Sequence, residues 1–176
     1  MNIAWILLYF LVINGLEIVI FFKVDGIGLT FERIFKAFLL KFLLGAIFAT
    51  FQFLDVSEYL SYFIEPLFGI CLSFLLLRGL PKKLLFFYGL FPIVLMDLFY
   101  RSVSYFVFPF LGQGIVDGDG NPLFLLIMLF VCFIVLVFLK WLNYDFTSLR
   151  KEILDKGFQK SLTKINWIMG AYFLVM

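Results

Sequence analysis

The sequence contains no histidine and few charged residues: of 176 residues, 15% are charged, and only two are cysteines. Without histidine, these residues cannot form a histidine-based zinc site, a Ser-His-Asp or Cys-His catalytic pair, or a phosphate-accepting histidine. We therefore expect no cofactor and no catalytic residue in this chain. Both cysteines, Cys71 and Cys132, fall in apolar segments and are predicted to be small buried residues without a disulfide. The net charge of +2 is spread over loops and gives no basic face for nucleic acid.

Apolar residues are abundant: 64% of the chain is hydrophobic, and the mean hydropathy is +1.10. A soluble domain of this length needs more polar surface to cover its core. Apolar runs of roughly 20 residues cross a bilayer, and they do so as helices because lipid cannot satisfy free backbone groups. The sequence thus predicts an all-α polytopic membrane helix bundle over residues 1–176, with five complete transmembrane helices and a truncated sixth. The expected spans are residues 3–22, 34–54, 59–78, 84–110 and 122–142, with a partial span at 167–176.

The loop charges predict the topology. Basic residues occur in the first, third and fifth gaps between the apolar runs, whereas the second gap carries only Asp55 and Glu58 and the fourth only Asp117 and Asp119. Basic loops stay on the cytoplasmic side of a membrane. We therefore expect a multi-pass protein of the cell membrane with its N-terminus outside.

The segment 145–164 has a different pattern from the spans. Apolar residues recur at intervals of three to five, and basic residues fall between them. This pattern predicts a basic amphipathic helix that lies on the inner leaflet as a cytoplasmic linker.

Two ionisable residues lie at a similar depth near the cytoplasmic ends of the first two spans. Glu17 is about five residues, and Lys41 about seven residues, from the ends of their spans, or roughly 8 to 11 Å deep at 1.5 Å per residue. We interpret them as a structural ion pair between neighbouring antiparallel helices. The alternative is that Lys41 extends to the lipid headgroups on its own.

A second ionisable group is predicted toward the outside. Glu65 lies in the third span, while Asp97 and Arg101 lie four residues apart on one face of the fourth span. The loop acids Asp55 and Glu58 are expected just above them. Either these five residues line an acidic, partly hydrated pocket for a cationic peptide, or the charges within the spans hold the third and fourth spans together.

Three stretches resemble a known family: MNIAWILLYFLVINGLEIVIFFKVDGIGLTFERIFKAF, YLSYFIEPLFGICLSFLLLRGLPKKLLFFYGL and FLKWLNYDFTSLRKEILDKGFQKSLTKINW. They are similar to the membrane sensor domain of streptococcal bacteriocin-locus histidine kinases, which are relatives of the competence and accessory-gene-regulator peptide receptors. The resemblance covers essentially the whole chain. It implies detection of an extracellular peptide pheromone by six or seven spans, followed in a full-length parent by a dimerisation helix and an ATP-binding kinase domain.

The kinase part is missing from this sequence. The resemblance therefore implies homodimerisation, kinase activity and a cognate response regulator only for a full-length parent. Two other classes stay open. One is a bacteriocin-immunity or intramembrane-protease-like protein, although the protease version lacks its histidines. The other is a transporter fragment, for which the break at Gly89 and Pro92 has no clear counterpart in the first span.

Overall fold

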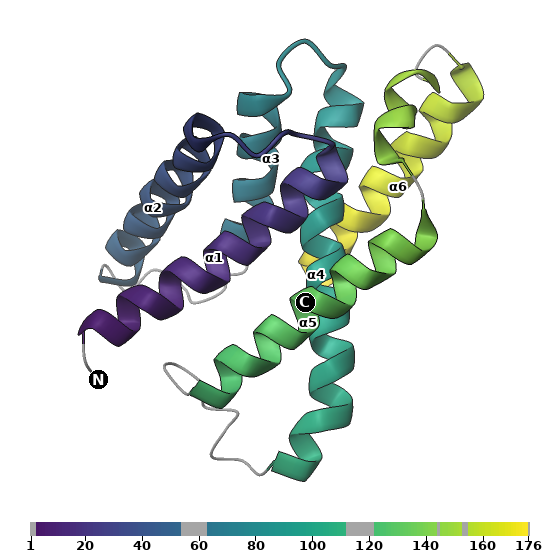
Figure 1. Ribbon diagram of the computed structural model, residues 1–176. Helices are drawn as coiled ribbons and strands as arrows, with labels where there is room; N and C mark the ends of the chain where they lie inside the picture. The colour runs from purple at the N-terminus through teal and green to yellow at the C-terminus, as the bar shows by residue number, and fades with distance from the viewer. Residues whose placement is uncertain (1–2, 54–62, 112–121, 144, 153–154, 176) are drawn as a thin grey trace. The chain divides into compact units, whose positions relative to one another are not determined.

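A computed structural model describes residues 3–53, 63–111, 122–143, 145–152 and 155–175 of the chain. Helices account for the regular structure of these ranges, which contain no strand. The all-α class is thus confirmed. In chain order the elements are α1 (Ile3–Asp25), α2 (Phe31–Phe53), α3 (Ile64–Leu76), α4 (Lys82–Leu111), α5 (Pro122–Leu142), the 3₁₀ helix η3 (Phe146–Arg150) and α6 (Lys156–Val175) (Figure 1).

The number of membrane-length helices is smaller than the five complete spans that the sequence predicts. Within the described ranges, two segments are long and apolar enough to cross a bilayer, Lys82–Phe106 of α4 and Leu125–Leu142 of α5. Helix α3 is apolar but only 13 residues long, about 20 Å at 1.5 Å per residue, against a hydrocarbon core of roughly 30 Å. Helix α2 carries Glu32, Arg33, Lys36 and Lys41 in its first eleven residues, which shortens its unbroken apolar stretch.

The chain divides into two compact units. The first comprises Met1–Ile20 and Leu95–Tyr144, and the second comprises Phe21–Val94 and Asp145–Met176. Helices α1 and α4 therefore each contribute to both units.

In the first unit, α5 buries one face and exposes the other. Val131, Cys132 and Val135 are buried at helical spacing, and the Phe138 ring lies 5.2 Å from the Phe99 ring of α4, centroid to centroid. Neither cysteine of the chain is in a disulfide. Cys132 is buried as predicted, but Cys71 on α3 in the second unit is exposed, so the expectation of burial was wrong for that residue.

In the second unit, the core forms around the first half of α4. Leu84 and Tyr88 of α4 are fully buried, and Leu149 of η3 packs into the same cluster. Helix α6 contributes Leu162, Met169 and Phe173, which the spacings of seven and four residues place on one helix face.

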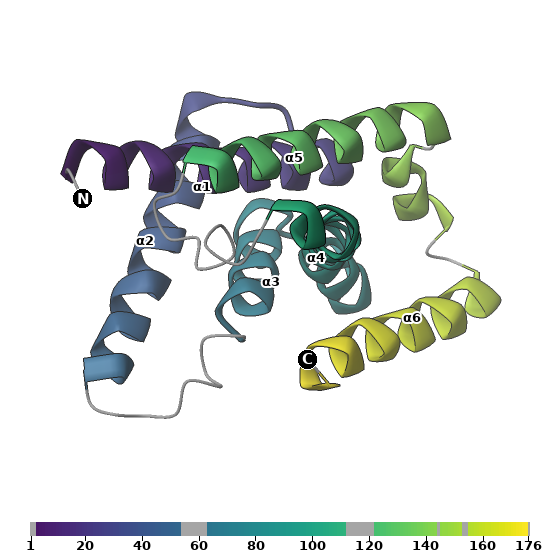
Figure 2. The same cartoon turned by 90° about the horizontal axis from the view of Figure 1, so that it is seen from below.

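The segment predicted as an amphipathic linker differs in form from that expectation. Residues 145–164 contain η3 and then the start of α6, which continues unbroken through Trp167 to Val175 (Figure 2). The linker and the expected partial span 167–176 thus share one helix. The physical reason is that Leu162 and Met169 bury against the same core, so both halves of the helix have a packing partner.

Helices α3 and α4 approach closely at a pair of glycines. A Cβ atom on Gly69 would lie 2.0 Å from the carbonyl oxygen of Gly89, and one on Gly89 would lie 2.7 Å from the Cα of Ile70. One turn away, the Ser73 hydroxyl is 2.7 Å from the carbonyl oxygen of Leu85, to which it can donate. Small residues that allow backbones to touch, with a hydroxyl bridging the helices, are typical of helix contacts in membranes.

Candidate functional site

The most unusual polar residue in the described structure is Asp25, the last residue of α1. Its side chain is fully buried, and neither carboxylate oxygen has a hydrogen-bond partner among the described residues. Buried carboxyl groups are normally paired, because an isolated charge loses its hydration without compensation. Asp25 is therefore a candidate functional residue, although it carries no local motif.

Arg150, at the end of η3, lies next to Asp25. The Arg150 Nη2 donates to the main-chain carbonyl of Asp25 rather than to its carboxylate. The guanidinium also lies over the ring of Tyr88, 5.2 Å from its centroid, and the Tyr88 hydroxyl donates to the carbonyl oxygen of Phe146 at 2.6 Å. These contacts join the end of α1, the first half of α4 and η3 within the second unit. We call the four residues Asp25, Tyr88, Phe146 and Arg150 the buried junction.

The electrostatics of the junction depend on burial. Desolvation raises the pKa of the Asp25 carboxyl well above its ordinary value of 3.8, and the charge of Arg150 only partly offsets this shift. Protonation of Asp25 therefore changes the charge next to the guanidinium. Chemically, the junction can hold or release one proton where three segments of the chain meet.

The turn after Asp25 fixes the local geometry. Gly26 has φ +60°, a left-handed conformation that favours glycine, and a Cβ there would lie 2.1 Å from Cγ2 of Thr147. On the other side, Asp145 caps η3 by accepting a hydrogen bond from the Thr147 main-chain N–H at 2.9 Å. Hydrogen bonds from the Thr147 hydroxyl and N–H lower the pKa of the Asp145 carboxyl. The pKa values of the two carboxyl groups therefore shift in opposite directions: the anion of Asp145 is stabilised and that of Asp25 is destabilised.

Lys41 pairs with Glu65 in the second unit. The Lys41 ammonium donates to the Glu65 carboxylate across α2 and α3, and it also lies 4.6 Å from the centroid of the Phe68 ring. The exposed fraction is 8% for the Lys41 side chain but 43% for that of Glu65. The pair joins two residues that the sequence had placed at different depths, and it leaves the acid half-accessible.

Asp97 and Arg101, which the sequence places on one helix face, form an ion pair. The Arg101 Nε lies 2.7 Å from Asp97 Oδ2 along α4, in the first unit. Glu65 belongs to the second unit, so the expectation that it lies close to Asp97 and Arg101 stays a prediction. The same holds for Glu17 with Lys41, since these residues also belong to different units. The loop acids Asp55 and Glu58 lie outside the described residues.

Sequence reasoning missed Asp25, Tyr88 and Arg150. Asp25 falls in the gap after the first apolar run, and Arg150 is one of several basic residues in the segment 145–164. Their contact spans 125 positions in the sequence, so no local pattern could have revealed it. Among the described residues, no three acidic or cysteine side chains gather closely enough to hold a metal ion.

Comparison of the chain with protein-family models, with curated proteins and with solved structures finds no match.

Proposed function

We propose that this chain is the membrane-embedded sensor region of a two-component receptor that detects an extracellular cationic peptide. The observation that carries the proposal is the unequal Lys41–Glu65 pair, in which a buried ammonium holds a carboxylate that is 43% exposed. A half-accessible acid among apolar helices is a site where a cation from outside can bind. The family resemblance of the sequence supports the same function.

The proposed topology has five complete crossings with the N-terminus outside and a further span that begins in α6. Its support is the alternation of basic and acidic loops. The observed bounds of α1, α2, α4 and α5 also agree with the expected spans to within three residues. A reporter fused after Asp117 should then be external and one after Lys156 cytoplasmic. The reverse result would contradict the topology.

In the proposed mechanism, a cationic group of the peptide competes with Lys41 for Glu65. The acidic outer loops concentrate the peptide and set its rate of association, which salt screens. Glu65 then sets affinity, because a charge-assisted hydrogen bond to a carboxylate between apolar helices is stronger than a contact in a hydrated loop. The Lys41–Glu65 pair joins α2 to α3, so its loss on peptide binding changes the contact between these two helices.

The output step would use residues beyond these 176, which include no histidine to accept a phosphate. Homodimerisation and a cognate response regulator are accordingly proposed only for a full-length parent. In the chain, η3 of the buried junction precedes α6.

The test is capture of peptides by the full chain reconstituted in lipid nanodiscs. The probe is the peptide fraction of medium conditioned by the source cells, with retained peptides identified by mass spectrometry. We expect one cationic peptide to be retained by wild type and at least about tenfold less by Glu65→Gln, because a charge-assisted hydrogen bond contributes ~1.5–3 kcal/mol. The matched control is Glu32→Gln, which removes an exposed acid paired with Lys36 on α2. Retention of no cationic peptide, or equal retention by both variants, would overturn the proposal.

A further inference from the structure

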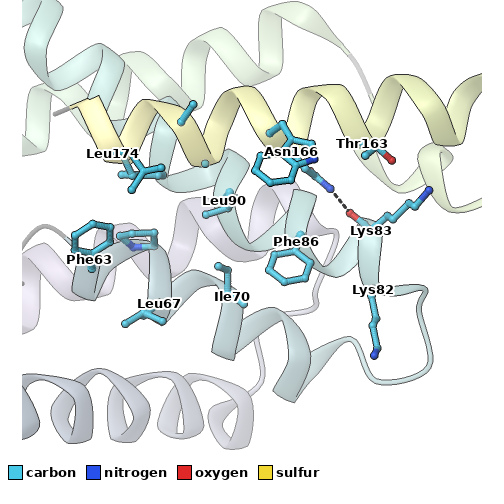
Figure 3. A pocket seen from close by; sticks show the side chains of 15 residues that line it. Phe63, Leu67, Ile70, Lys82, Lys83, Phe86, Leu90, Thr163, Asn166 and Leu174 are labelled. Atoms are coloured by element: carbon cyan, nitrogen blue, oxygen red, sulfur yellow. Dashed lines mark hydrogen bonds between the residues drawn. The ribbon is translucent and has the colours of Figure 1, made fainter.

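The second unit contains a pocket bounded by α3, the first half of α4 and α6 (Figure 3). Its volume is about 700 Å³, within the roughly 300–1,000 Å³ typical of pockets that hold small molecules.

The two ends of this pocket differ in chemistry. Phe63, Leu67 and Leu174 lie together at one end, and Lys82 and Lys83 lie at the other (Figure 3). Between them the walls are mainly apolar. The pocket is therefore elongated and amphipathic, with positive charge confined to one end.

The polar end offers more than two ammonium groups. Lys82 and Lys83 are the first two residues of α4, where the helix dipole adds partial positive charge. Asn166 of α6 donates from Nδ2 to the carbonyl oxygen of Lys83 at 2.7 Å. The other amide atom, Asn166 Oδ1, is buried and has no hydrogen-bond partner among the described residues. This acceptor is enclosed by protein, so the charge at this end of the pocket comes from the two lysines and the helix dipole.

We propose that this pocket binds one anionic phospholipid of the cytoplasmic leaflet, such as phosphatidylglycerol. The phosphate lies at the start of α4. Lys82 and Lys83, whose side chains diverge in Figure 3, turn toward it on binding, and an acyl chain lies along the apolar walls. The charge pattern places both lysines on the cytoplasmic side. Basic pockets between membrane helices on that side suit anionic headgroups. The choice of leaflet rests on the proposed topology, but the pocket is not lined by Glu65 and its binding of lipid does not depend on peptide sensing.

The experiment uses the full chain purified in a neutral detergent, with phosphatidylglycerol or phosphatidylcholine added in a titration. Native mass spectrometry counts bound lipids, and the midpoint of thermal unfolding gives an independent affinity. We expect saturation at one tightly bound phosphatidylglycerol and no such saturation with phosphatidylcholine.

Two variants probe the two ends of the pocket. Lys82→Gln with Lys83→Gln should weaken phosphatidylglycerol binding by at least about tenfold, because each lysine near an anionic headgroup contributes roughly fivefold. Gly170→Leu should abolish the tight site, since a Cβ at Gly170 meets no atom within 4 Å and the larger side chain can occupy the pocket.

Each variant has a matched control that keeps the pocket intact. Lys156→Gln with Lys160→Gln removes two exposed charges of α6 that do not line the pocket. Gly45→Leu adds the same side chain on α2, where a Cβ also has open space. Both controls should bind phosphatidylglycerol like wild type.

Equal binding of phosphatidylcholine would overturn the proposal, as would a loss of binding in the lysine control as large as that in the Lys82 and Lys83 variant. Occupation of the pocket by a second copy of the chain would also overturn it. That outcome would appear as a dimer that Gly170→Leu dissociates and added lipid does not.

Discussion

Arg150 donates a hydrogen bond to the main-chain carbonyl of Asp25, 125 positions earlier in the sequence, while the Asp25 carboxylate beside it has no hydrogen-bond partner among the described residues. The guanidinium therefore holds the backbone of α1 in place without directly neutralising its last side chain. The stability of the second unit should consequently depend on the protonation of Asp25.

The first prediction concerns pH. Because the pKa of Asp25 is raised in the folded protein, the folded state keeps its proton at pH values where the unfolded chain has lost it. The free energy of unfolding should therefore fall as pH rises above about 3.8, until Asp25 also ionises in the folded state. Thermal unfolding in detergent across this range measures the effect. Asp25→Asn should flatten this part of the profile, and Glu152→Gln, at an exposed site, should leave it unchanged.

The second prediction concerns Arg150. Arg150→Ala should lower the free energy of unfolding by about 1–3 kcal/mol, because it leaves the buried Asp25 carbonyl unpaired and removes the cation over Tyr88. It should also extend the pH dependence upward, since the charge of Arg150 lowers the pKa of Asp25. Arg78→Ala, at an exposed site, is the control. Equal losses for the two variants would show that Arg150 has no special role.

The third prediction concerns the helix contact at Gly69. Gly69→Ala places a methyl group 2.0 Å from the Gly89 carbonyl oxygen, so α3 and α4 must separate and the thermal midpoint should drop. Gly45→Ala meets nothing within 4 Å and should be neutral or stabilising by up to about 1 kcal/mol, the difference in helix propensity. The two substitutions are chemically identical, so a drop in the thermal midpoint for Gly69→Ala alone can be assigned to the α3–α4 contact. An equal drop for both variants would contradict this prediction.

The fourth prediction concerns the Lys41–Glu65 pair. In a double-mutant cycle, Lys41→Met and Glu65→Gln should be non-additive by about 0.5–3 kcal/mol, because only 8% of the Lys41 side chain is exposed. The exposed pair Glu32–Lys36 should show a clearly smaller coupling, because solvent screens it. Adding Glu17→Gln to the Lys41→Met background tests the second predicted partner of Lys41. If the losses in the free energy of unfolding caused by Glu17→Gln and Lys41→Met simply add, the Glu17–Lys41 pairing is wrong.

Helix positions were the most predictable part of the fold. Residues 122–142 were expected as a span and form α5 with those bounds, because an uninterrupted apolar run follows Pro122, a residue well suited to a helix start. The continuity of α6 was not predicted. The charge pattern of residues 156–164 is that of a surface helix, and only contacts of Leu162 with the distant core show that the helix packs instead.

The site was less predictable than the helices. Counting residues from span ends placed Lys41 and Glu65 at different depths, but a lysine side chain is long, and α3 is only 13 residues. The depth of a residue, counted from the end of its span, therefore does not determine which residue it pairs with. Asp25 could not be found at all, because its burial depends on η3, which lies more than a hundred positions further along the chain.

Helix α6 has a mechanical consequence. At 1.5 Å per residue its 20 residues form a rod about 30 Å long. Three lysines, Lys156, Lys160 and Lys164, lie along its first half, and Phe173 is anchored in the core near its far end. Leu162 and Met169 anchor the same helix in the same core. A force on the lysines is therefore resisted along the whole buried face of α6 and not at a single point.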